Sequence, residues 1–262
     1  MSAKSILTGL ISKKNKKRLK YLTEIGEPRQ FQFDGSSDIK KDIIDNYNFD
    51  GELLDIFVNN KQVLVHKWHH YIPIYDRYFS RFRGTDVRFL EIGVFKGGSL
   101  QMWRKYFGEK AKIFGIDIDP DCIKYQGIDG EVRIGSQDDA KFLKEIIAEM
   151  GGVDVVLDDG SHQMKHIMAT LQSVLPNVSE GGIYMIEDLH TAYWRNFGGG
   201  LKSSTNFFNG IRTIVDDMHH WYHGRRMRMP EISKHCRSIH IYDSIVVIEK
   251  GKIQRPTYSE VI

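Results

Sequence analysis

Acidic side chains are concentrated at two places in the sequence, each directly after a short and largely apolar run. The sequence DDGSH at 158–162 follows residues 153–157, and the sequence ED at 187–188 follows residues 182–186. If both runs are neighbouring strands of one parallel sheet, their ends lie ~4.8 Å apart. Two like charges about 4 Å apart repel by roughly 4 kcal/mol at an effective dielectric constant of about 20. Some of these carboxyl groups must therefore be protonated, paired with Lys or Arg, or bound to a cation.

A cation held only by oxygen ligands is a hard divalent ion, and Mg²⁺ is the first expectation. The alternative is that the acids cap helices and pair with basic side chains. His162 follows Asp159 by three residues, and imidazole is the side chain best suited to accept a proton near neutral pH. His166 lies one helical turn further on, and we assign it to packing or to the surface because a hard-ion site does not need imidazole.

A second candidate site is the glycine-rich sequence EIGVFKGGS at 91–99. Glycine at Gly93 and Gly97 lets the backbone turn tightly and approach a ligand closely. Glu91 precedes the first glycine by two residues and suits a ligand that carries a positive charge, such as an ammonium or a sulfonium group. We assign Glu91, Gly93, Gly97 and Ser99 to cofactor binding, and the alternative is a tight strand-to-helix turn without a ligand.

Asp117 ends the next apolar run, 112–117, about 20 residues after the glycines. A carboxylate at this point can accept hydrogen bonds from the hydroxyl groups of a ribose. A nicotinamide dinucleotide would use the same contact, so Asp117 alone does not choose between cofactors.

Short apolar runs that alternate with helical stretches would position these residues. We predict strands at 87–92, 112–117, 131–134, 153–157 and 182–186, and helices near 99–107, 139–150 and 166–175. This alternation indicates βαβ units and a parallel sheet with right-handed crossovers. Two further strands, at 238–242 and 244–249, leave no room for a crossover and must pair antiparallel. The prediction is an α/β fold with a doubly wound, mostly parallel seven-stranded sheet and an antiparallel C-terminal hairpin.

This order of elements resembles the Rossmann-like fold of the class I S-adenosylmethionine-dependent methyltransferases. The resemblance implies S-adenosylmethionine as the cofactor and places the loop GSQDD at 135–139 beside its adenine. Gln137 and Asp138 are therefore candidates for cofactor binding, although Asp138 could instead cap a helix. We also assign Asp158 to the cofactor side of the site.

The acidic segments resemble a narrower group. VLDDGSH at 156–162, GGIYMIED at 181–188 and TAYW at 191–194 look like the metal-dependent, mycinamicin-type sugar O-methyltransferases of macrolide biosynthesis. A more distant similarity is to the cephalosporin hydroxylase/rhamnosyl O-methyltransferase group. The resemblance covers about residues 66–250.

This resemblance implies a role for each residue of the acidic segments. Asp159, Glu187 and Asp188 match the positions that hold Mg²⁺, and His162 matches the general base. It also implies a sugar-containing acceptor, on a glycan, a glycolipid or a glycosylated natural product, and a homo-oligomer.

Composition removes several other classes of protein. With 41% hydrophobic and 27% charged residues, the 262-residue chain is globular rather than disordered. Two cysteines make no disulfide framework and fit a reducing, cytoplasmic compartment. A net charge of +3 is too small to imply a nucleic-acid partner. We find no apolar window long enough for a membrane-spanning helix.

The basic residues are unevenly spread, because residues 1–20 carry seven Lys and Arg side chains and no acid. The segment is either a helix on an anionic membrane surface, at the inner face of the membrane, or a solvated terminus, and we favour the second. We treat 1–65 as a partly helical N-terminal extension and 66–262 as the methyltransferase domain. An aromatic stripe at 68–82 is expected to pack in the core, and 197–206 to form a loop over the site. Aromatic and basic side chains at 209–228 could contact a sugar or a phosphate.

The resulting hypothesis is a metal-dependent O-methyltransferase that acts on a sugar hydroxyl. The alternatives are a nicotinamide-dependent dehydrogenase, a nucleic-acid methyltransferase and a non-catalytic binding protein on the same fold. The acidic cluster expected from Asp158, Asp159, Glu187 and Asp188 argues against the dehydrogenase, since hydride transfer does not need such a cluster.

Overall fold

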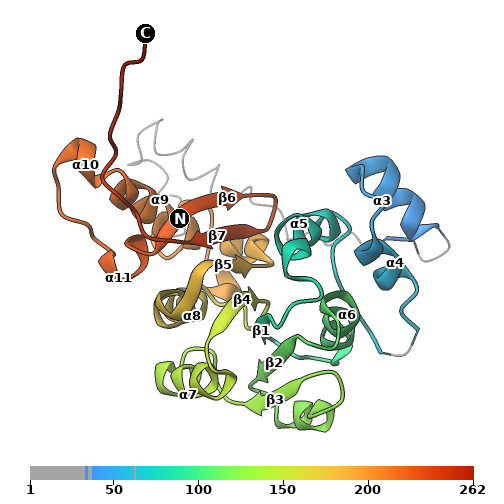
Figure 1. The fold of residues 1–262 in the computed structure, drawn as a ribbon. Helices are drawn as coiled ribbons and strands as arrows, with labels where there is room; N and C mark the ends of the chain where they lie inside the picture. The colour runs from blue at the N-terminus through green and yellow to red at the C-terminus, as the bar shows by residue number, and fades with distance from the viewer. Residues whose placement is uncertain (1–32, 35–36, 62) are drawn as a thin grey trace, which may run out of the picture. The chain divides into compact units, whose positions relative to one another are not determined.

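The described residues form one seven-stranded sheet (Figure 1). The computed structural model describes residues 33–34, 37–61 and 63–262. The strand order is β3-β2-β1-β4-β5-β7-β6. The strands are β1 (Arg88–Ile92), β2 (Lys112–Asp117), β3 (Glu131–Ile134), β4 (Val153–Asp158), β5 (Val178–Ile186), β6 (Cys236–Ile241) and β7 (Val246–Lys250).

The direction of the strands confirms the predicted sheet. β1 to β5 pair in parallel, whereas β7 lies antiparallel between β5 and β6. β5 begins at Val178, four residues before the predicted start at 182. The sequence reads as a turn there because of Gly181 and Gly182. A Cβ on Gly182 would lie 2.4 Å from the Asp154 carbonyl oxygen, so glycine permits the strands to approach rather than ending one of them.

Helices cover both faces of the sheet (Figure 1). The α-helices are α3 (Ile39–Tyr47), α4 (Glu52–Val58), α5 (Tyr71–Phe79), α6 (Gly98–Phe107), α7 (Ala140–Met150), α8 (Met164–Val174), α9 (Phe207–Met218), α10 (His220–His223) and α11 (Pro230–Ser233). Short 3₁₀ turns are η1 (Ser80–Phe82), η2 (Pro120–Tyr125), η3 (Leu175–Asn177), η4 (Leu189–Tyr193) and η5 (Arg195–Phe197).

The alternating residues of β1 separate two hydrophobic cores. Phe89 packs in the core formed with α5 and α6, whereas Leu90 and Ile92 pack in the core formed with α7 and α8. This is the period of two expected for a strand whose faces are both covered. Because both faces are buried, the chemistry is restricted to the ends of the strands.

The aromatic stripe packs in the core, as predicted. Trp103 of α6 is fully buried, and its ring centroid lies 5.2 Å from that of Tyr75, 5.5 Å from Phe79 and 5.3 Å from Phe89. Two hydroxyl groups on α5, those of Tyr71 and Tyr75, extend from this core toward the acidic cluster. Helix α5 therefore has both a packing role and a polar role.

The segment before α5 shares this core, since Ile43 of α3 and Leu53 and Leu54 of α4 are fully buried in it. The division into 1–65 and 66–262 stays a prediction. Residues 1–20, with the membrane hypothesis, lie outside the described residues. Within the part of the chain that the structure describes, no helix has the length and apolar character to cross a membrane.

Candidate active site

A cavity of about 440 Å³ opens at the carboxyl ends of the parallel strands. It is lined by residues that follow β1, β2, β3, β4 and β5, and by the segment 64–68 that precedes α5. Eight of the twelve predicted site residues line it: Gly93, Ser99, Asp117, Gln137, Asp159, His162, Glu187 and Asp188. The cofactor candidates and the acidic cluster thus share one cavity.

The loop after β1 fits tightly against the loop after β4. Gly93 has φ +100°, and a Cβ on it would lie 2.2 Å from the Asp159 carbonyl oxygen. The Asp159 amide in turn donates to the Ile92 carbonyl oxygen at 2.9 Å. Glycine is required at this position because both the backbone angle and the contact exclude a side chain.

Asp117 lines the cavity and also holds the glycine loop. Its Oδ2 accepts hydrogen bonds from the amides of Val94 and Phe95, both at 2.9 Å, and its Oδ1 accepts one from the amide of Asp119. Gly97 is not among the lining residues. It is the N-cap of α6 with φ +74°, and a Cβ there would lie 2.7 Å from the Tyr125 ring. These contacts within the chain fix the shape of the loop.

Glu91 lies behind the cavity wall rather than on it. Its side chain is fully buried and accepts hydrogen bonds from the Ser99 hydroxyl at 2.8 Å and from the Trp103 indole at 3.2 Å. Burial raises the pKa of Glu91 to about 7, although the charge of Lys67 opposes this. In this structure, the Glu91 carboxyl group anchors the N-terminal part of α6 through these two hydrogen bonds.

Replacing Glu91 with glutamine should make stability less dependent on pH. An acid whose pKa is higher in the folded state binds its proton more tightly there, so the free energy of unfolding falls as pH rises from about 4.5 to about 7. We expect this fall, between pH 5 and pH 8, to be about 2–3 kcal/mol larger in the wild type than in Glu91→Gln. Urea unfolding at both pH values measures it. Parallel pH dependence in the two proteins would show that Glu91 titrates normally.

Gln137 joins the loops after β3 and β4. Its amide nitrogen donates to Asp158 Oδ1 and to the Thr170 hydroxyl, both at 3.1 Å, and its carbonyl oxygen accepts from the Ser161 amide at 2.6 Å. Asp158 is buried and also accepts from the Tyr184 hydroxyl at 2.9 Å. Burial raises the pKa of Asp158 to about 6. Asp158 is therefore a buried support for the loop and does not line the cavity.

Asp138 lies outside the cavity wall, where it accepts from the Ser136 hydroxyl at 2.5 Å. The alternative in which it caps a helix is wrong, because Asp139 is the N-cap of α7. His166, assigned to packing or to the surface, lines the cavity; its Nε2 lies 3.5 Å from Asp138 Oδ2 and its Nδ1 lies 2.9 Å from the Ser161 hydroxyl.

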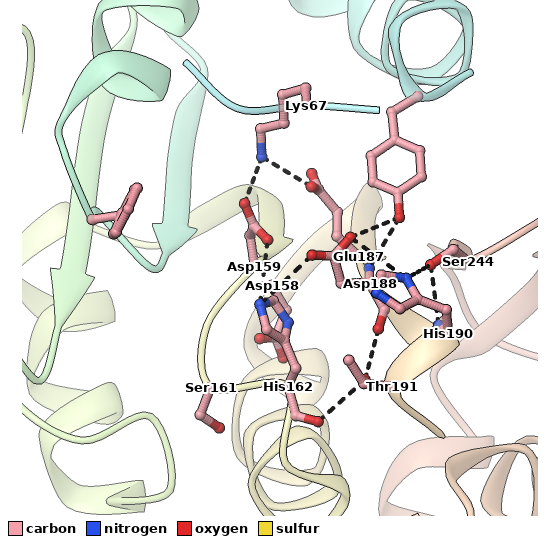
Figure 2. A network of polar contacts seen from close by, with 12 residues as sticks. Lys67, Asp158, Asp159, Ser161, His162, Glu187, Asp188, His190, Thr191 and Ser244 are labelled. Carbon is pink, nitrogen blue, oxygen red and sulfur yellow. Dashed lines mark hydrogen bonds and ion pairs between the residues drawn. The ribbon is translucent and has the colours of Figure 1, made fainter. Parts of the chain in front are cut away.

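The acidic cluster contains a basic residue that the sequence analysis missed (Figure 2). The Lys67 ammonium lies 2.6 Å from Asp159 Oδ2 and 2.9 Å from Glu187 Oε2, with only 3% of its side chain exposed. Burial favours the neutral amine, but the charges of Asp159 and Glu187 outweigh burial and raise the pKa of Lys67 above its ordinary value. The alternative of pairing with a basic side chain is thus realised for two of the acids.

Two tyrosine hydroxyls complete the cluster. Tyr75 donates to Glu187 Oε1 at 2.6 Å, and Tyr71 donates to Asp188 Oδ1 at 2.8 Å. Glu187 is fully buried, and burial together with the charge of Asp159 raises its pKa. The spacing of four residues between the tyrosines predicts that they share one face of a helix. It does not predict that their hydroxyl groups contact acids more than 100 residues away in the sequence.

His162 faces the oxygens that Lys67 and the tyrosines leave open. Its Nε2 lies 3.9 Å from Asp159 Oδ1 and 3.8 Å from Asp188 Oδ2. One ligand atom from each of these three residues lies within 4.8 Å of the others. This donor set fits a hard cation at Asp159 and Asp188. Both oxygens of Glu187 already accept hydrogen bonds, so this carboxylate fits a cation only through an oxygen that it shares.

The side of the site next to Asp188 is aromatic. His190 Nδ1 lies 2.7 Å from the Ser244 hydroxyl, and burial lowers the pKa of His190. Its ring centroid lies 5.5 Å from that of Trp68 and 4.8 Å from that of Trp194. Trp68 lines the cavity. These rings offer apolar faces of the kind that stack on sugars.

The loop expected over the site and the segment expected to contact the acceptor do not line the cavity. None of the residues that line the cavity comes from 197–206 or from 209–228. The Phe197 ring, at the start of the first segment, lies 6.5 Å from the His162 ring by centroids. In the second, buried Asp217 accepts from the amides of Arg228 and Met229 and fixes the chain after α10.

Comparisons with known proteins agree with this geometry. Residues 90–189 match the family Methyltransf_24, described as a methyltransferase domain. The chain is 37% identical over 210 residues to demethylmacrocin O-methyltransferase of Streptomyces fradiae, covering 72% of this chain and 51% of that protein. It is 35% identical to mycinamicin VI 2''-O-methyltransferase of Micromonospora griseorubida, covering 70% and 49%. The chain thus spans about half the length of the curated relatives it matches.

A solved structure shares the fold. The methyltransferase MycE of the mycinamycin biosynthetic pathway, in complex with Mg, SAH and mycinamycin VI, superposes with a TM-score of 0.64 at 32% identity. The match covers 74% of this chain and 54% of that one.

Proposed function

Because this chain carries a methyltransferase domain of the Methyltransf_24 family and resembles the macrolide sugar O-methyltransferases, we propose that it transfers a methyl group from S-adenosylmethionine to a sugar hydroxyl. One observation carries the proposal. A glycine loop suited to a nucleoside cofactor and an acidic cluster suited to a hard cation open into the same cavity, and His162 lines that cavity beside Asp159 and Asp188.

Each residue in this proposal has a task that its place in the structure supports. Gly93 lets the cofactor approach the backbone, and Asp117 is at the strand end from which a carboxylate reaches ribose hydroxyls. Asp159 and Asp188 would hold the cation, and Glu187 would join them through Oε2, the oxygen that accepts from Lys67 in this structure. When bound, S-adenosylmethionine supplies the methyl group, and Mg²⁺ lowers the pKa of the acceptor hydroxyl.

His162 accepts the proton of the acceptor hydroxyl at Nε2. The neighbouring carboxylates of Asp159 and Asp188 stabilise the imidazolium that this transfer forms. Trp68, which lines the cavity and packs against the ring of His190, offers a ring face that would orient the sugar. Holding the hydroxyl in line with the methyl group contributes much of the rate. The acceptor we propose is a glycosylated macrolide or a related polyketide glycoside. That the protein forms a homo-oligomer, that it is cytoplasmic and that residues 1–20 contact a membrane all stay predictions.

Titration calorimetry tests the cofactor half of the proposal. S-adenosylhomocysteine should bind the wild-type protein, and NAD should show no comparable binding. The competing dehydrogenase hypothesis expects the reverse preference, and that result would end the methyltransferase proposal. Transfer of a labelled methyl group to a panel of macrolide glycosides and nucleotide sugars then identifies the acceptor.

Replacing Asp188 with asparagine tests the metal half. Asp188 has φ +54°, a conformation that asparagine tolerates, and the Tyr71 hydroxyl can still donate to the amide oxygen. We expect affinity for Mg²⁺ to fall about 10–100-fold, excess Mg²⁺ to restore part of the activity, and affinity for S-adenosylhomocysteine to stay unchanged. Asp138→Asn is the matched control outside the cavity wall. Equal losses in both variants would argue against Asp188 as a ligand.

A further inference from the structure

The acidic cluster contains its own cation. We propose that the Lys67 ammonium occupies the acidic cluster in the metal-free protein and that a divalent cation displaces it from Asp159 and Glu187. This inference rests on the proposed metal site. It assigns Lys67 a role in regulating how that site is loaded, in addition to the roles of the ligands.

The Lys67 side chain is buried against the acidic cluster and depends on it for its counter-charges. A lysine side chain that is 3% exposed needs partners for its charge, and Lys67 has two, at 2.6 and 2.9 Å. Glu187 has no alternative counter-charge in these contacts, because its other oxygen accepts from the neutral Tyr75 hydroxyl. Without a metal, the ammonium is what keeps Asp159 and Glu187 from repelling each other.

Lys67 would compete with a metal ion, because its ammonium group contacts oxygens of Asp159 and Glu187 that the metal would also use. A Mg–O bond is about 2.1 Å long. A magnesium ion that shared Glu187 Oε2 with the Lys67 ammonium, which lies 2.9 Å from this oxygen, would be no more than about 5 Å from it. Two cations at this distance in a buried site repel strongly. Full use of the three carboxylates therefore requires the ammonium to leave.

The position of Lys67 in the chain allows this exchange. Asp159 and Glu187 follow strands of the central sheet, whereas Lys67 precedes α5 in a segment without helix or strand (Figure 2). Its neighbours His66 and Trp68 also line the cavity. The four-carbon side chain can move its charge along the cavity wall while the carboxylates stay in place.

Two measurements test the exchange, and neither needs an acceptor or turnover. The first is calorimetric titration of metal-free protein with Mg²⁺ alone, at low ionic strength, for the wild type and for Lys67→Met. We expect Lys67→Met to bind Mg²⁺ at least about tenfold more tightly, because the competing charge is gone. Its melting temperature without metal should be lower than that of the wild type, and Mg²⁺ should raise it by more. Lys96→Met removes a charge from the same cavity wall and should change Mg²⁺ affinity less than about threefold.

The second measurement uses the wild type, so it holds even if Lys67→Met does not fold without metal. Reductive methylation followed by mass spectrometry should find Lys67 protected in the metal-free protein and several-fold more reactive with Mg²⁺. Equal or weaker Mg²⁺ binding by Lys67→Met, or reactivity that Mg²⁺ does not change, overturns the exchange and leaves the metal site intact. No Mg²⁺ binding by either protein overturns both, while binding of S-adenosylhomocysteine still tests the methyltransferase proposal separately.

Discussion

Replacing His162 with alanine should lower turnover by roughly 10²–10⁴-fold, the usual contribution of a general base. The imidazole lies 3.8–3.9 Å from oxygens of Asp188 and Asp159, so it faces the place where an acceptor hydroxyl would lie. Affinities for S-adenosylhomocysteine and Mg²⁺ should change little, since other residues hold both. The acid limb of the wild-type pH–rate profile should be absent from the variant.

A second variant separates chemistry from backbone strain. His162 has φ +54°, which costs alanine more than it costs asparagine. His162→Asn should therefore lose the same turnover as His162→Ala while keeping the wild-type melting temperature. Normal turnover in either variant would remove His162 as the base. His190 would then be the next candidate, because Asp158 is buried behind the cavity wall.

Replacing Gly93 with alanine should abolish cofactor binding and destabilise the fold. The backbone angle of +100° strains any side chain, at a cost of about 1–3 kcal/mol. The new methyl group would also lie 2.2 Å from the Asp159 carbonyl oxygen, and overpacking of this kind costs about another 1–3 kcal/mol. Since backbone atoms make this contact, the loops after β1 and β4 must separate. Urea unfolding and calorimetry with S-adenosylhomocysteine measure both effects.

Gly84→Ala is the matched control for Gly93→Ala. Gly84 has a positive φ of +69°, but a Cβ on it would meet no atom within 4 Å. It should therefore show the cost of the backbone angle alone and leave cofactor affinity unchanged. A Gly93→Ala protein with the stability of Gly84→Ala and normal affinity for S-adenosylhomocysteine would mean that the two loops do not form one unit.

Much of the fold follows from local sequence patterns. Each parallel strand is a short apolar run bounded by turn residues, and the two C-terminal strands are too close for anything but antiparallel pairing. β5 was predicted too short because Gly181 and Gly182 look like a turn until the Asp154 backbone is seen beside them. A glycine that permits close approach and one that ends a strand are identical in sequence.

The site was predictable where it depends on strand ends and not where it depends on distant partners. Asp159, His162, Glu187 and Asp188 follow neighbouring strands, so the topology alone brings them together. Lys67 is 92 residues from Asp159 in the chain, and nothing in its local sequence marks it as buried. The sequence also did not reveal that the oxygens of Glu91 accept from Ser99 and Trp103 on the buried side, and its role in cofactor binding stays a prediction.

Helix α5 has a consequence for how this protein could change by mutation. One side of it is packed against Trp103 and Phe89 through Phe79, and its tyrosines hold the carboxylates of Glu187 and Asp188. A substitution that shifts the helix by a fraction of an ångström moves both hydroxyl groups. Selection in the laboratory for a different metal or acceptor should therefore enrich changes in the aromatic core beneath α5, at positions that no substrate ever touches.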